Sequence, residues 1–184
     1  VTFGPSIQTA QTQPYFIDAL RFNVPNFDFE SNSIGAPNWS DLFSFSADGN
    51  GWGNIVDSST GMPANSPGGG TKALKATEGS GAWSGTNIGS VDSADSLLGA
   101  GSLKASVVFY SPIAGETLRL KVENRANSAL AITADQVTVA GWQTLVFDFA
   151  NPSAGSFNAS VNYNIATVTF GPSIQTAQTQ PYFI

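Results

Sequence analysis

The stretch 101–124, GSLKASVVFYSPIAGETLRLKVEN, contains two runs in which apolar and polar residues alternate. The apolar positions are Leu103, Ala105, Val107 and Phe109 in the first run, and Leu118, Leu120 and Val122 in the second. Alternation with a period of two is typical of a β-strand with one face on the core and the other in solvent. Pro112 and Gly115 separate the runs and predict a turn. We therefore predict two strands joined as a hairpin.

The rest of the chain repeats this pattern of short apolar runs separated by turn residues. Downstream, the expected strands lie in 130–139, in 142–149 with Leu145, Phe147 and Phe149 on the core face, in 162–172 and in 181–184. Upstream they lie near 27–30, 39–46, 52–58 and 71–77, with a Gly-rich loop at 64–71 and a turn at 91–98. About ten short strands with turns roughly every 8 to 12 residues predict an all-β fold, an antiparallel two-sheet sandwich or jelly roll.

The seventeen residues 1–17, VTFGPSIQTAQTQPYFI, recur without a change at 168–184, an offset of 167 residues. Identity that extends through the loop residues indicates one period of a tandem array plus a short overlap. We predict that 1–22 is the C-terminal strand segment of the preceding repeat or a strand exchanged between units, that 23–26 is the joint, and that 27–184 is one β-sandwich domain. The expected inter-repeat strand comprises Tyr15, Phe16, Ile17, Tyr182, Phe183 and Ile184.

Composition narrows the classes of function. Seven Lys and Arg residues against thirteen Asp and Glu give a net charge of −6, and no basic cluster exists, so a nucleic-acid partner is not expected. Charged residues make up only 11% of the chain, a low fraction that is typical of secreted β-proteins. We therefore expect an extracellular or cell-surface location, in a bacterium. No segment has 18 consecutive apolar residues, so we do not expect a membrane span.

The chain lacks the usual constellations of catalytic residues. It has no His, the common general base at neutral pH, and no Cys. Thirteen carboxylates would suffice in number for a glycosidase, but they are scattered through turns and no pair stands out. We therefore expect no enzymatic activity.

The order of several motifs resembles a known family. FDFE at 27–30, GAWSG at 81–85, the stretch 102–124, GWQTLVFDF at 141–149 and the final TVTFGP and PYFI are similar to the jelly-roll modules of secreted bacterial laminarinases and related glycanases. The resemblance implies a carbohydrate-binding-type sandwich, often with a structural Ca²⁺ where the first and last strands meet. Its matching ligands here are Glu30 and Asp18, with Asp28 nearby; Ala19 replaces the second of the family's paired aspartates.

Glycan binding would require exposed aromatic rings beside polar side chains, because sugar C–H surfaces stack on rings while polar groups bind hydroxyls. The candidates are Trp52, Trp83, Trp39, Tyr110 and Arg119, although core packing is the stronger interpretation for Trp39 and Trp83. Trp52 lies between two glycines and is the best candidate for exposure. Trp142 enters an apolar strand, so we expect it to cap the core.

Two hypotheses remain from the sequence. The first is a structural repeat of an extracellular fibre, filament or giant surface adhesin, in which neighbouring copies join head to tail, as separate beads or by strand exchange through the duplicated segment. The alternative is a carbohydrate-binding module that recognises an extracellular polysaccharide and gains avidity from repetition. The duplication favours the first.

Overall fold

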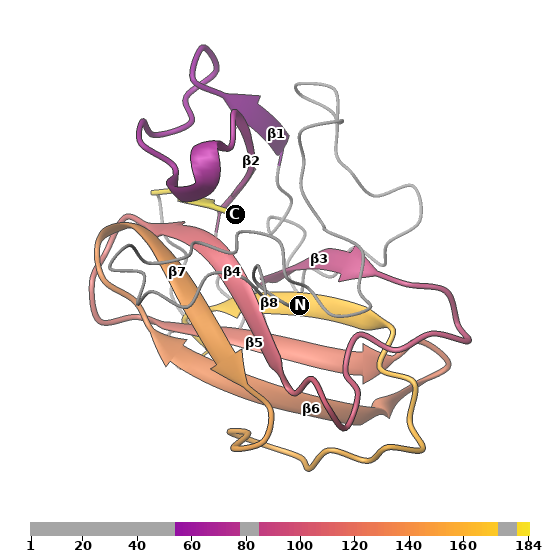
Figure 1. The fold of residues 1–184 in the computed structure, drawn as a ribbon. Helices are drawn as coiled ribbons and strands as arrows, with labels where there is room; N and C mark the ends of the chain where they lie inside the picture. Colours follow the sequence, from indigo (N-terminus) through magenta and orange to yellow (C-terminus); the bar gives the residue numbers. More distant parts are fainter. Residues whose placement is uncertain (1–53, 78–84, 173–179) are drawn as a thin grey trace, which may run out of the picture.

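The computed structural model describes residues 54–77, 85–172 and 180–184. This part of the chain forms nine β-strands and one short 3-10 helix, arranged as two antiparallel sheets (Figure 1). The predicted all-β sandwich is therefore confirmed. Within the described residues no helix is long and apolar enough to cross a membrane.

The five-stranded sheet has the order β1-β2-β9-β4-β7. Its strands are β1 (Asn54–Asp57), β2 (Lys72–Ala76), β9 (Tyr182–Phe183), β4 (Lys104–Ser111) and β7 (Gly141–Asp148). The helix η1 (Pro67–Gly69) lies in the connection from β1 to β2, within the predicted Gly-rich loop. The last strand of the sequence thus occupies the middle of this sheet.

The four-stranded sheet has the order β3-β8-β5-β6. Its strands are β3 (Gly85–Ser90), β8 (Ile165–Phe170), β5 (Thr117–Asn124) and β6 (Asn127–Val137). β5 and β6 form a hairpin, and β8 pairs with both β3 and β5. The segment 130–139, expected to hold one or two short strands, lies mainly in the single strand β6.

The main core lies between the sheets, and the apolar faces that the alternation predicts for β4, β5 and β7 are part of it. These strands contribute Val107 and Phe109, Leu118, Leu120 and Val122, and Leu145 and Phe147, while β8 contributes Ala166, Val168 and Phe170. All of them are buried, as is Phe149 just after β7. Burial of a large apolar side chain contributes about 1.5–3 kcal/mol, so these faces account for the pairing of the two layers.

The predicted hairpin between 101–112 and 117–124 is wrong. These runs form β4 and β5, but β4 pairs with β7 and β9, whereas β5 pairs with β6 and β8 in the other sheet. The connection crosses from one layer to the other, with Gly115 at a φ of 87°. Both strands bury their apolar faces in the same core from opposite sides, and alternation cannot distinguish strands that face each other from strands that lie side by side.

One close backbone approach fixes β3 against β8. Gly85 pairs with Thr169, and a Cβ at residue 85 would lie 2.1 Å from the carbonyl oxygen of Val168. Only glycine allows this approach without displacement of the backbone. Nearby, the Thr167 hydroxyl donates a hydrogen bond to Asn87 Oδ1 at 2.5 Å, and both side chains are buried.

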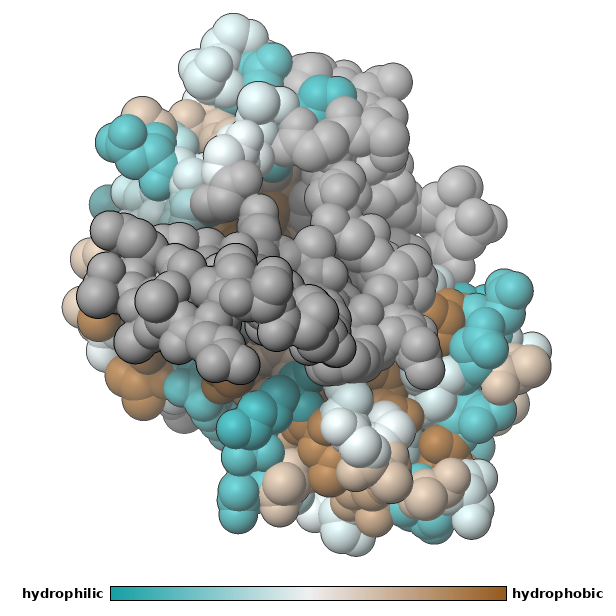
Figure 2. Space-filling view, in the orientation of Figure 1, coloured by the Kyte–Doolittle hydropathy of each residue, from teal (hydrophilic) through white to brown (hydrophobic). Residues whose placement is uncertain are grey.

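The surface of the described residues carries four exposed large apolar side chains. Large ones are exposed on β6, on β7 and in the turn between them: Leu130, Val137, Val139 and Val146. On the face of the molecule that Figure 2 shows, hydrophobic and hydrophilic residues are intermixed among the coloured residues. Single exposed apolar residues are ordinary on folded proteins.

Candidate functional site: the position of the terminal strand

The candidate site is the place of β9 between β2 and β4, which we call the β9 position. β9 is antiparallel to both neighbours. Phe183 lies opposite Lys75 on β2 and Tyr110 on β4, and Tyr182 lies opposite Ala76. Ile184 then exchanges two backbone hydrogen bonds with Leu74, at 3.0 and 2.8 Å. Three consecutive residues at the end of the sequence therefore join β2 to β4.

Tyr182 points into the main core. Its ring stacks on Phe170 of β8, with centroids 4.6 Å apart and an interplanar angle of 1°, and on Phe109 of β4 at 5.7 Å. Its hydroxyl donates a 2.6 Å hydrogen bond to Glu116 Oε2, and both residues are buried. A hydrogen bond to a buried carboxylate contributes about 1.5–3 kcal/mol. Tyr182 therefore combines a large apolar contact with one specific polar contact.

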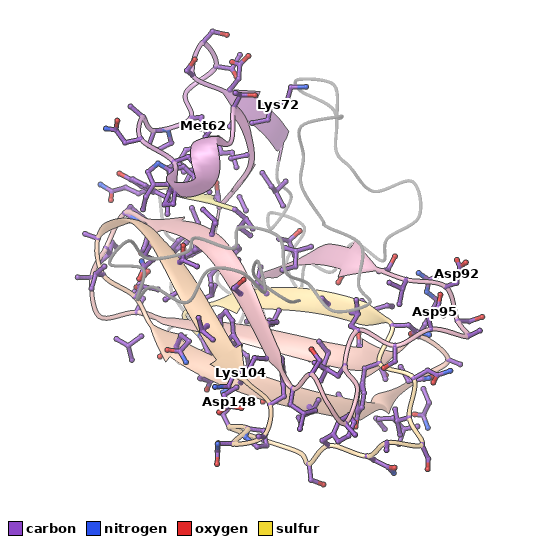
Figure 3. The ribbon with its side chains drawn as sticks, in the orientation of Figure 1. Met62, Lys72, Asp92, Asp95, Lys104 and Asp148 are labelled. Atoms are coloured by element: carbon purple, nitrogen blue, oxygen red, sulfur yellow. The ribbon has the colours of Figure 1, made fainter. Side chains whose placement is uncertain are left out.

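Phe183 points to the other side of the sheet, into a second, smaller apolar group that we call the outer cluster. The outer cluster comprises Val56, Met62, Ala73 and Phe183, with Tyr110 and Trp142 packed against it. Phe183 lies edge-on to Tyr110 at 5.6 Å and tilted to Trp142 at 6.4 Å. Figure 3 shows Met62 in the lobe formed by β1, β2 and η1. Phe183 thus holds this lobe against the remainder of the sheet.

The local sequence explains this two-sided burial. In a strand covered on one face, polar residues alternate with apolar ones; in a strand covered on both faces, the apolar run is continuous. The end of the sequence is such an unbroken apolar run, formed by Tyr182, Phe183 and Ile184. Both faces of β9 are indeed buried, which is the condition of an inner strand.

The duplicated segment 168–184 supplies an inner strand to each sheet. Its first residues, Val168 to Phe170, end β8, whose six residues are all buried, and its last residues form β9. The two parts meet in the core, where Phe170 stacks on Tyr182. One copy of the segment therefore provides structural elements on both sides of the sandwich.

The β9 position also connects β1 and β2 to the other strands of the five-stranded sheet. β1 pairs only with β2 among the described strands, and β2 reaches the other strands only through β9. A second contact is the hydrogen bond of 3.1 Å from Trp142 Nε1 to the Pro63 carbonyl. Among the described strands, β9 thus provides the backbone pairing that connects the β1–β2 pair to β4 and β7.

Two of the predicted glycan-binding residues are engaged in internal contacts. Tyr110 is partly buried in contact with the outer cluster, between Trp142 and Phe183. Arg119 lies on the outer face of β5, where its Nε and Nη2 each donate a 2.8 Å hydrogen bond to Asp135. This hydrogen bonding lowers the pKa of Asp135 and raises that of Arg119. Trp39, Trp52 and Trp83 lie outside the described residues.

Trp142 does not cap the main core as expected. It packs against the outer cluster on the opposite face of the five-stranded sheet. The reason is the alternation of β7, in which Leu145 and Phe147 face the main core, and Trp142 does not share their side of the strand. The contact that sets its position is made by Phe183, which is distant in sequence.

The residues predicted to bind Ca²⁺, Asp18, Asp28 and Glu30, lie outside the described residues, as do Tyr15, Phe16 and Ile17. The structure does describe Tyr182, Phe183 and Ile184, and brings them together at the β9 position. Within 54–77, 85–172 and 180–184, acidic side chains do not gather in a group of three that could hold a metal ion.

Glu116 belongs to the site although the sequence pattern does not single it out. It lies in the turn region between two predicted strands, where a carboxylate is ordinarily exposed. In the fold it is only 6% exposed and accepts the Tyr182 hydroxyl. The alternation of a strand predicts its faces, but a polar pair between residues 66 positions apart has no such signal.

Neither a scan against protein-family models nor a search of curated proteins found a match to this chain.

Proposed function

We propose that this chain is a structural repeat of an extracellular filament, fibre or surface adhesin, in which units join head to tail through the duplicated segment. The observation that carries the proposal is the β9 position. A sequence that occurs twice supplies the central strand of the five-stranded sheet. The residues that fill this position, Tyr182, Phe183 and Ile184, recur without change as Tyr15, Phe16 and Ile17.

The chain has two copies of the segment but one β9 position, and this difference supports assembly. One sandwich has one β9 position, and its own C-terminal copy fills it. The copy at 1–17 has the same side chains and therefore matches the same position in a different unit. That unit is either the preceding repeat of one long chain or a separate molecule. In both cases the contact is head to tail and does not close on itself, so it builds a linear array.

Electron microscopy of the purified chain tests this proposal. Filaments with an axial repeat of one domain are the expected result, since each added unit contributes one sandwich. Isolated particles over a wide range of protein concentration would contradict assembly between separate chains. They would favour the carbohydrate-binding alternative, which binding of the monomer to a polysaccharide array would then support.

Ca²⁺ enters the proposal as a stabiliser of the joint between units. Asp18 follows the first copy of the segment and Glu30 begins the expected domain, so a cation held by both would connect consecutive units. Removal of Ca²⁺ with a chelator should shorten the filaments and its restoration should lengthen them. Filaments of unchanged length, together with no heat of Ca²⁺ binding in calorimetry, would exclude this role while leaving assembly itself intact.

A further inference from the structure

β6 is an edge strand, and its open side is a place where another chain could pair. Among the described strands it is last in the order of its sheet and pairs with β5 alone. The run from Asn127 to Ala134 carries no charge, no Pro and no Gly, and its first four residues are exposed. An uncharged, exposed edge of this kind is a template for edge-to-edge pairing and aggregation. The side chains of β6 thus give this edge little protection.

The connection from β7 to β8 crosses the open side of β6 (Figure 1). The Thr133 N–H donates a hydrogen bond of 3.0 Å to the Ala154 carbonyl, and the Thr133 carbonyl accepts one of 2.8 Å from the Ser153 N–H. The hydroxyl oxygens of Thr133 and Ser153 lie 3.0 Å apart, within hydrogen-bond distance. Both backbone groups that Thr133 directs away from β5 are therefore occupied.

Gly155 brings the same connection against the neighbouring outward position of the strand. Its φ is 77°, in the left-handed region that favours glycine. A Cβ at residue 155 would lie 2.6 Å from the Ala131 carbonyl oxygen and 3.2 Å from the Ile132 Cα. A residue with a side chain at this position must therefore move the connection away from β6.

The segment 150–155 closes the edge without forming a strand of its own. It is held at its start by the Asp148 carboxylate, which accepts hydrogen bonds from the Ala150 N–H at 3.0 Å and from the Asn151 side-chain amide at 3.1 Å. It meets β6 in a single bridge, and Pro152 within it has no N–H to donate. It therefore covers the middle of β6 but offers no regular ladder to a further strand.

We propose that the segment 150–155, which we call the edge cap, prevents β6 from pairing with β6 of a second copy of this chain. Two β6 edges that meet antiparallel would form an isologous contact and join two four-stranded sheets into one. The edge cap occupies the outward positions of Ala131 and Thr133, so a second strand cannot align along β6. This inference goes beyond the proposed function, because β6 and the β9 position belong to different sheets.

Displacement of the edge cap tests the inference. Gly155→Val, the uncapped chain, places a branched side chain against β6. Gly69→Val is the matched control, because Gly69 has a φ of 72° and open space around its Cβ. Both changes are made in a Tyr15→Ala chain, so that the first copy of the duplicated segment does not contribute. In sedimentation velocity, the uncapped chain should self-associate at least about tenfold more tightly than the control, since it gains a backbone ladder.

Amide hydrogen exchange connects this association to the edge of β6. At low protein concentration, the Thr133 amide of the uncapped chain should exchange at least about tenfold faster than in the control, because its acceptor has moved away. At high concentration, protection should return to the outward N–H groups of Ala131, Thr133 and Asp135. Addition of Leu130→Lys, at a position that is 42% exposed, should abolish both the association and this protection, because a charge on an edge strand opposes pairing.

Three results would overturn the proposal. An uncapped chain whose Thr133 amide exchanges faster but that associates no more than the control would show that an open β6 does not pair. An unchanged Thr133 amide would contradict the close approach of Gly155. Association that survives Leu130→Lys would place the contact on another surface. If Gly155→Val does not fold, Ser153→Pro removes the N–H that bonds the Thr133 carbonyl without the Cβ contact, and the same outcomes apply. Each is a difference between matched chains, so it is distinguishable from failure of the proposed function.

Discussion

The two sheets of the sandwich are held together in different ways. In the four-stranded sheet, neighbouring strands align over long stretches: β5 with β6 from Thr117 to Asn124, and with β8 from Leu118 to Glu123. In the five-stranded sheet, β9 aligns with β2 at two residues and with β4 at one. The side chains of Tyr182 and Phe183 add contacts on both faces of the sheet to this short backbone pairing.

The largest effect that we predict is for Tyr182→Ala. This change removes the stacking on Phe109 and Phe170 and leaves Glu116 buried without the hydroxyl that it accepts. Replacement of a large buried aromatic residue by alanine typically costs about 3–5 kcal/mol. The free energy of unfolding in urea should fall by that amount, and amide exchange should accelerate in β1 and β2 before it does in β5 and β6.

Val146→Ala is the control for this measurement, because Val146 lies on β7 of the same sheet with half of its surface exposed. It should leave exchange in β1 and β2 unchanged. Equal acceleration in both sheets of the Tyr182→Ala chain would show that β9 does not connect the β1–β2 pair specifically.

The second prediction concerns the four-stranded sheet. Gly85→Ala would place a Cβ against the carbonyl of Val168, so β3 must move away from β8. Overpacking against backbone costs about 1–3 kcal/mol, measured as a lower midpoint of thermal unfolding. Gly99→Ala has open space around its Cβ and should leave the midpoint nearly unchanged. Equal midpoints for the two variants would contradict the close approach of β3 and β8.

A third prediction separates the polar contact of Tyr182 from its ring. Tyr182→Phe retains the stacking but removes the hydrogen bond to Glu116. The loss should be about 1–3 kcal/mol, because the carboxylate stays buried. The double variant Tyr182→Phe with Glu116→Gln should recover part of the loss, since a neutral amide costs less to bury. If Tyr182→Phe is as stable as the unchanged chain, the hydrogen bond contributes nothing.

The smallest effect concerns acid stability. Arg119 lowers the pKa of Asp135 in the folded chain through their hydrogen bonds. This contribution is present above the unfolded-state pKa of about 3.9 and is lost as pH falls through the folded-state value. Asp135→Asn should therefore cost about 1 kcal/mol or less near neutral pH, as for other partly exposed ion pairs, and nothing in strong acid.

Asp95→Asn is the control for the acid experiment, because Asp95 is exposed in the loop after β3 (Figure 3). Urea unfolding of both variants from pH 7 to pH 2 gives the comparison. A cost for Asp135→Asn that persists unchanged to pH 2 would show that the Asp135 charge is not its source.

The sequence predicts the strands more reliably than their partners. The alternation in β4, β5 and β7 predicts the buried faces correctly, because a period of two depends only on local geometry. Which strands pair depends on the path of the chain between them. The runs that form β4 and β5 are adjacent in sequence, yet they pack across the core in different sheets.

The candidate site could likewise be predicted from the sequence only in its local features. The duplication and the unbroken apolar run at 182–184 single out the terminal strand from sequence alone. The place of that strand between β2 and β4, and the contacts of Tyr182 with Glu116 and Phe183 with Trp142, arise from long-range packing. Trp142 illustrates both parts: the alternation of β7 places it on the side opposite Leu145 and Phe147, whereas its contact with Phe183 arises from long-range packing.

The most direct test of the account is sedimentation velocity of three chains over a range of concentrations: the unchanged chain, Tyr15→Ala and Tyr182→Ala. The two variants make the same substitution in the two copies of one sequence. We predict that the unchanged chain associates with increasing concentration, that Tyr15→Ala remains monomeric with its unfolding free energy intact, and that Tyr182→Ala is destabilised yet still associates. Association of Tyr15→Ala at the level of the unchanged chain would contradict the claim that the first copy of the segment joins one unit to the next.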